Sequence, residues 1–142
     1  MNKADPCTEE EVAQLVNAFY ARVHEDPLIG PVFADHITDW PTHLGKMVDF
    51  WSASLRGTAR FRGNPMAAHN RIAGVSETHF QRWLALFRQT TQSMENQAMR
   101  ERADELSLRI AQSLWYGYQL NGSPDMPPLT LQRRAFEAGG RS

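Results

Sequence analysis

Apolar residues recur at helical spacing along most of the first 122 positions of the chain. The segment Thr8-Glu9-Glu10-Glu11 has the pattern of a capping box, and apolar side chains then return every three or four positions as far as Val23. This spacing predicts a first helix that runs to about His24. Asp26-Pro27 ends it, and residues 28–33 carry too many Gly and Pro interruptions for more than a turn or two.

A second helix is predicted to begin after Asp39, which can cap it, with Pro41 tolerated in the first turn and Gly57 at the end. The pattern is lost between Gly57 and Gly74, where Gly63-Asn64-Pro65 has the composition of a turn. Only residues 65–70 can form a short helix there, and the remainder of this stretch is expected to be loop.

Two longer helices are predicted after this stretch. Ser76 caps the first of them. Its expected buried face consists of bulky apolar residues: Phe80, Trp83, Leu84, Phe87 and Met94. The last helix runs from about Asn96 to Asn121-Gly122. Since no segment alternates in the manner of a β-strand, the sequence predicts an all-α fold.

The organisation predicted is one helical domain over residues 1–122 and a C-terminal tail over residues 123–142. The tail holds Pro124, Pro127, Pro128 and a Gly139-Gly140 pair, and no periodic apolar face. A segment that cannot bury apolar surface is expected to be disordered.

Composition and charge narrow the classes of function. The formal net charge is −1 with acids and bases interspersed, which disfavours nucleic-acid and membrane partners. The single cysteine, Cys7, excludes an internal disulfide, and no apolar signal segment is evident, so a cytoplasmic location is expected. The sequence has no GxGxxG, Walker, GxSxG or HExxH motif, which argues against the corresponding nucleotide-binding and hydrolase mechanisms.

Four side chains are candidates for chemistry, although each taken alone is more often a core or surface residue. His69 lies on the predicted short helix after Gly63-Asn64-Pro65, where an imidazole can be held rigidly to bind a metal. His43 precedes a bulky apolar wall on the second helix. Trp83 offers an indole N–H, and Tyr20 offers a hydroxyl at the end of the first helix's apolar stripe.

Across Thr8 to Gly122 these residues resemble the group III truncated haemoglobins. The matching pieces occur in the family's order, and they are Phe19-Tyr20, Gly30-Pro31-Val32-Phe33, Trp40-Pro41-Thr42-His43 with Lys46-Met47 and Phe50-Trp51, Gly63-Asn64-Pro65 with His69, and Phe80 with Trp83-Leu84 and Leu86-Phe87. The resemblance implies a truncated globin-like two-over-two helical sandwich in which the proximal helix is reduced to a stub.

The resemblance also implies a haem site. His69 would bind the iron, and Tyr20, His43 and Trp83 would face a diatomic ligand such as oxygen, nitric oxide or carbon monoxide. The expected haem contacts are Phe33, Lys46, Met47, Phe50, Trp51, Met66, Ile72, Phe80 and Phe87. Lys46 is one turn past His43, from where it could reach a propionate or simply remain a solvated surface lysine.

Three functions remain open on the sequence. The first is reversible binding of oxygen or another diatomic ligand. The second is a haem enzyme of the same fold, performing nitric oxide dioxygenation or peroxide chemistry, for which a reductase is a conceivable partner. The third is a haem-free helical module that binds a partner helix.

Overall fold

The computed structural model describes residues 7–58 and 75–122, and within these ranges every regular element is a helix. The helices are α1 (Glu9–Glu25), α2 (Gly30–His36), α3 (Trp40–Arg56), α5 (Glu77–Gln92) and α6 (Gln97–Gly122). The predicted all-α fold is confirmed. The predicted short helix at residues 65–70 and the tail at residues 123–142 lie outside the described residues.

The helix ends follow the local sequence. At the start of α1, the Glu11 N–H donates to Thr8 Oγ1 at 3.1 Å and the Thr8 N–H donates to Glu11 Oε1 at 2.8 Å, which forms the predicted capping box. At the start of α3, Asp39 Oδ1 accepts from the Thr42 N–H at 3.2 Å. Gly57 ends α3 with φ of +77°, a left-handed conformation that glycine adopts without the steric cost of a Cβ.

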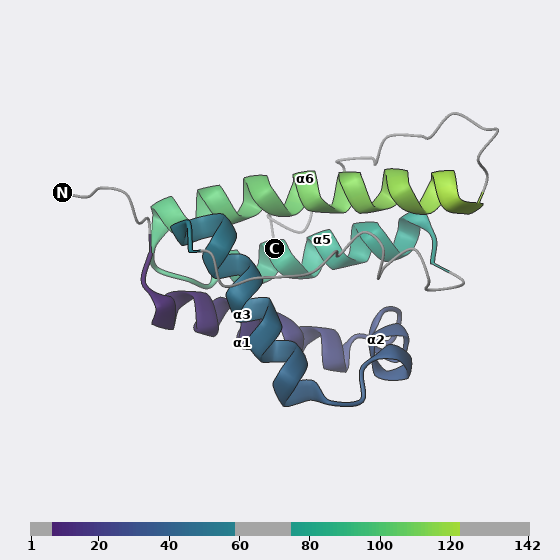
Figure 1. Cartoon of the computed structure of the whole chain (residues 1–142), viewed down its shortest axis with the longest axis horizontal. Helices are drawn as coiled ribbons and strands as arrows, with labels where there is room; N and C mark the ends of the chain where they lie inside the picture. The colour runs from purple at the N-terminus through teal and green to yellow at the C-terminus, as the bar shows by residue number, and fades with distance from the viewer. Residues whose placement is uncertain (1–6, 59–74, 123–142) are drawn as a thin grey trace.

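The helices form two layers (Figure 1). The α1·α3 pair packs on the antiparallel α5·α6 hairpin through contacts between α1 and α5 and between α3 and α6. The short α2 contacts only α1 among the described helices, and it lies beyond the end of α1 in Figure 1. This arrangement is the predicted two-over-two sandwich.

The main core lies where α1 crosses α3 and α5. The largest side chains that are almost wholly buried there include Leu15, Phe87 and Met99. Met94 was predicted on the α5 face, but α5 ends at Gln92 and Met94 lies in the connection to α6. At the end of α5, Ser93 Oγ donates to the Thr90 carbonyl at 2.7 Å. At the start of α6, Asn96 Oδ1 accepts from the Met99 N–H at 3.0 Å, so polar side chains hold the turn between the two helices.

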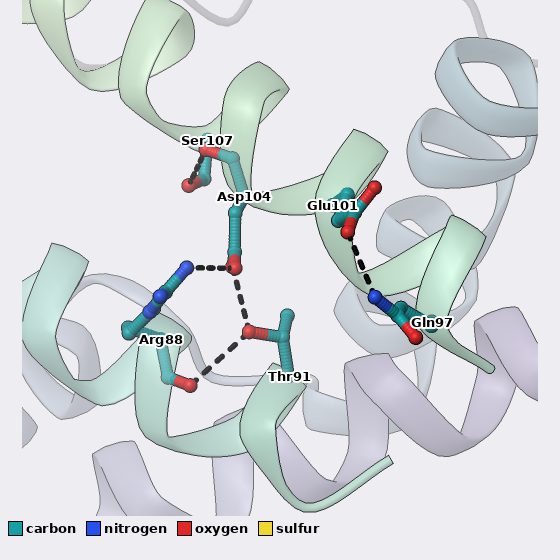
Figure 2. A network of polar contacts seen from close by, with 6 residues as sticks. All are labelled: Arg88, Thr91, Gln97, Glu101, Asp104 and Ser107. Atoms are coloured by element: carbon teal, nitrogen blue, oxygen red, sulfur yellow. Dashed lines mark hydrogen bonds and ion pairs between the residues drawn. The ribbon is translucent and has the colours of Figure 1, made fainter. Parts of the chain in front are cut away.

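A buried polar network joins the two helices of the hairpin (Figure 2). The Asp104 carboxylate of α6 accepts from Arg88 Nη1 at 2.5 Å and from Thr91 Oγ1 at 2.6 Å. Ser107, also buried, donates from Oγ to the Asp104 carbonyl at 2.8 Å. The apolar spacing from which the sequence predicted these two helices did not reveal this polar contact.

No helix within residues 7–58 and 75–122 has the length and apolar character that crossing a membrane requires.

Candidate haem pocket

A cavity of about 430 Å³ lies between the layers and is lined by side chains from every described helix. Most of its lining is apolar or aromatic: Tyr20, Ile29, Val32, Phe33, His36, Ile37, His43, Met47, Phe50, Trp51, Val75, His79, Phe80, Trp83, Ile110, Ala111 and Leu114. Three of the four side chains singled out in the sequence, Tyr20, His43 and Trp83, line this one cavity from three different helices. The fourth, His69, lies outside the described residues.

Tyr20 enters the cavity from the last part of α1. Its ring packs edge-on against Phe33 at 5.7 Å and against His43 at 5.2 Å between ring centroids. Burial raises the pKa of its hydroxyl well above the ordinary value of 10, so the group stays a neutral O–H donor at physiological pH. Within the described part of the chain, no group accepts a hydrogen bond from that hydroxyl, which leaves the donor available to a ligand.

His43 comes from the first turn of α3, which the Asp39 cap fixes. Its ring stands nearly perpendicular to Tyr20, at 87°, and to Trp40, at 88°. The Nε2 atom is buried. Two aromatic rings therefore hold the imidazole against the cavity wall, and its orientation is set by packing as well as by the helix start.

Trp83 lies on the middle of α5 and is half-buried. Its indole stacks on Phe87 at 5.5 Å with an interplanar angle of 14°, and the edge of Phe19 contacts it at 5.3 Å. Phe87 in turn stacks on Trp51 at 5.0 Å. This aromatic stack supports Trp83 from behind, away from the cavity, so the ring has little freedom to rotate.

The corner between α1 and α2 supplies another wall. Asp26 Oδ2 accepts from the backbone N–H groups of Leu28 and Ile29 at 3.0 and 2.9 Å, which fixes the turn after α1. Gly30 is required here because a Cβ would lie 2.8 Å from the Val23 carbonyl oxygen. The tight corner brings Ile29 and Phe33 to the cavity.

The expected haem contacts fall into three groups. Five line the cavity: Phe33, Met47, Phe50, Trp51 and Phe80. Two do not: Phe87 is buried behind Trp83 and Trp51, and Lys46 is exposed on α3. Met66 and Ile72 lie outside the described residues. All nine stay predictions as haem contacts.

Sequence reasoning missed two histidines in the lining. His36 on α2 donates from Nδ1 to the Val32 carbonyl at 2.9 Å. His79 on α5 accepts from the Ser76 N–H at its Nδ1, at 3.1 Å. The position of His79 three residues after Ser76 was a usable signal for the helix-start contact. No sequence signal indicated that either ring, or Ile110 and Leu114 of α6, would face a cavity.

The cavity suits a flat, largely apolar cofactor. Its volume is within the range of roughly 300–1,000 Å³ that is typical of small-molecule sites, and its few polar side chains are concentrated among aromatic ones. Among the described residues, no group of three or more His, Cys, Asp or Glu side chains could hold a metal ion by itself. The aromatic and apolar lining, with a few polar side chains on it, fits an organic cofactor such as haem.

Comparison with known proteins gives consistent matches. The family described as bacterial-like globins matches residues 7–114. The chain is 28% identical over 123 residues to the group 3 truncated hemoglobin ctb of Campylobacter jejuni, covering 82% of this chain and 97% of that protein. The crystal structure of a group III truncated hemoglobin from Campylobacter jejuni aligns with a TM-score of 0.71 and 28% identity, covering 76% of this chain and 88% of the other.

Proposed function

Because the chain belongs to the bacterial-like globin family, a family of haem proteins, we propose that its cavity holds haem and that the protein reversibly binds oxygen or another diatomic ligand there. The observation that carries the proposal is the convergence of Tyr20, His43 and Trp83 on one largely apolar cavity. Haem, when bound, supplies the iron to which such a ligand attaches. The protein supplies the shape, the donors and the exclusion of water.

The donors are suited to a small ligand that carries partial negative charge. The Tyr20 hydroxyl is held neutral by burial, and the Trp83 indole N–H cannot ionise in the physiological range. A neutral donor can hydrogen-bond the ligand without delivering a full charge into an apolar site. Met47, Phe50 and Trp51 give the same space apolar walls, which are unfavourable for water.

We propose His69 as the iron ligand, on the sequence position alone. Haem titration of the purified protein and its variants, followed by the intense Soret absorption band, tests whether the protein takes up haem and whether His69 binds the iron. His69→Ala is expected to abolish stable haem retention, while the matched His43→Ala keeps it, because His43 serves the ligand side. Equal haem loss in both variants would remove His69 from this role. A wild-type protein that takes up no haem would favour the helix-binding module instead.

Tyr20→Phe and Trp83→Phe test the donors, because each keeps the aromatic bulk and deletes one hydrogen-bond donor. Each is expected to raise the oxygen dissociation rate roughly tenfold or more, since a hydrogen bond to a charged acceptor contributes about 1.5–3 kcal/mol. Carbon monoxide release should change less because that ligand carries less charge.

Matched controls exist on α6. Tyr116→Phe and Trp115→Phe remove the same atoms from residues that do not line the cavity, and both should leave ligand release unchanged. An oxygen dissociation rate that is unaltered in Tyr20→Phe and Trp83→Phe would contradict the proposed pocket.

Three donors in one pocket also support a second candidate, a haem enzyme acting on nitric oxide or peroxide, because each could donate to an oxygen atom that departs or rearranges. Nitric oxide or peroxide turnover that collapses in the donor variants, while oxygen release changes little, would favour the enzyme over the binding protein.

A further inference from the structure

We propose that Arg82 and Asp26 form a positioning pair that sets the distance between the α1–α2 corner and Trp83, and so controls how firmly the pocket holds its ligand. The inference rests on the proposed function for its effect on ligand binding. Its geometric part concerns only this chain. Neither residue lines the cavity, so the pair would act through the residues that it places.

Asp26 is built into the corner at three points. Its Oδ2 accepts the Leu28 and Ile29 N–H groups, and its backbone carbonyl accepts the Gly30 N–H at 3.0 Å. Its side chain is only 4% exposed. Ile29 and Phe33 form part of the cavity wall. A displacement of this carboxylate would therefore shift the backbone that positions them.

Arg82 connects that carboxylate to α5. Its Nη1 donates to Asp26 Oδ1 at 2.5 Å, from the residue immediately before Trp83. Trp83 stacks on Phe87 and meets Phe19 edge-on, and these contacts restrain its ring but not the position of the helix backbone relative to the α1–α2 corner. The ion pair restrains the helix segment that carries the indole.

The packing of the described helices gives the pair this role, because α2 lies against α1. Among the described helices, α2 contacts α1 alone, and the cavity lies between α2 and α5. The Asp26–Arg82 pair thus joins the two walls that face each other across the cavity. Asp26 lies three residues before Ile29 in one wall, and Arg82 lies one residue before Trp83 in the other.

A matched control lies on the same helix. Arg88 also donates from Nη1 to a mostly buried aspartate, Asp104, at 2.5 Å, but that pair joins α5 to α6 and lines no cavity. Arg82→Gln and Arg88→Gln remove the same charge from the same helix. Any general loss of stability on breaking an ion pair should be visible in both variants.

In the haem-free protein, we expect Arg82→Gln to shift the Trp83 indole resonance in a ¹H–¹⁵N spectrum, assigned with Trp83→Phe, and to speed amide exchange of Leu28 and Ile29 at least tenfold. Arg88→Gln should do neither. In the haem-loaded protein, Arg82→Gln should raise the oxygen dissociation rate at least threefold and broaden the stretching band of bound carbon monoxide.

Asp26→Asn provides an independent variant, because its amide oxygen can still accept the two backbone N–H groups while the charge facing Arg82 is lost. It should reproduce the effect of Arg82→Gln, and the double variant should be no worse than either single one. Arg82→Lys retains the charge and should release oxygen at a rate between those of Arg82→Gln and the wild type.

The inference would be overturned if haem-loaded Arg82→Gln and Arg88→Gln released oxygen at the same rate, whether or not that rate differed from the wild-type rate. A wild-type protein without haem would overturn the proposed function instead. The indole resonance and the amide exchange would then decide the positioning role by themselves.

Discussion

Two regions along α5 contain the same chemical pair in different surroundings. At the corner, Arg82 reaches Asp26, and at the hairpin, Arg88 reaches Asp104, with 2.5 Å between the nitrogen and oxygen in each case. The Asp26 side chain is 4% exposed and the Asp104 side chain 11%. On distance and exposure alone, the two aspartates would be expected to behave alike.

The pKa values of the two carboxyl groups are nevertheless shifted in opposite directions. Burial acts to raise the pKa of Asp26, but the Ile29 N–H, the Arg82 side chain and the Leu28 N–H together outweigh it, and the pKa lies below the ordinary 3.8. Burial also acts to raise the pKa of Asp104, and there it prevails over the Thr91 hydrogen bond and the Arg88 charge, so the pKa lies above 3.8. The two backbone N–H donors at Asp26 have no counterpart at Asp104.

The comparison shows that the partner alone does not determine what a buried charge does. At the corner, the backbone is folded around the carboxylate, which makes the ionised form a fixed part of the turn that carries Ile29 to the pocket wall. At the hairpin, the carboxylate is held by side chains between two helices, where the charge is costly but its hydrogen bonds keep α5 and α6 in register. The first region shapes the site and the second supports the frame.

The largest expected effect is at the hairpin. Asp104→Ala leaves Arg88 partly buried without its partner and removes an acceptor from Thr91. Loss of one member of a buried pair costs about 3–5 kcal/mol, and because the Arg88 side chain is 31% exposed, we expect a loss of about 2–3 kcal/mol in the free energy of unfolding. Chemical denaturation followed by circular dichroism measures it.

The same variant tests the division between frame and site. Since neither Asp104 nor Arg88 lines the cavity, oxygen dissociation from folded, haem-loaded Asp104→Ala should stay within twofold of wild type. A much larger change would show that the hairpin also shapes the pocket, and the contrast between the two regions would fail.

A smaller effect is expected in the pH dependence of stability, with opposite signs for the two aspartates. The folded-state pKa of Asp26 is lowered, so its contribution is fully present above the unfolded value of 3.8 and is lost as the pH falls through the lower folded-state pKa. The folded-state pKa of Asp104 is raised, so the cost of its ionisation appears as the pH rises above 3.8.

Denaturation of wild type, Asp26→Asn and Asp104→Asn separates the contributions of the two aspartates. A range from about pH 2.5 to 7 covers both titrations. Relative to Asp26→Asn, the wild type should gain stability with rising pH below 3.8 and then level off. Relative to Asp104→Asn, it should lose stability with rising pH above 3.8. Slopes of the same sign would contradict the difference drawn between the two regions.

The sequence alone determined the long described helices, most of their ends and the family resemblance, because these depend on neighbours in the chain. The capping residues Thr8 and Asp39 and the terminal Gly57 act within one turn of their own positions, and an apolar stripe needs only a period of 3.6 residues. Tyr20, His43 and Trp83 could be singled out because their residue types and order resemble a family pattern.

Only the tertiary structure decided which side chains meet. Asp26 and Arg82 are 56 residues apart, and Arg88 and Asp104 are 16 apart on different helices, so no local spacing rule connects them. His36 and His79 had no periodic signal that pointed to a cavity, and Phe87, apolar like the lining, lies behind it. Helical periodicity identifies a face that is buried, but whether it meets another helix or a ligand space depends on how the layers pack.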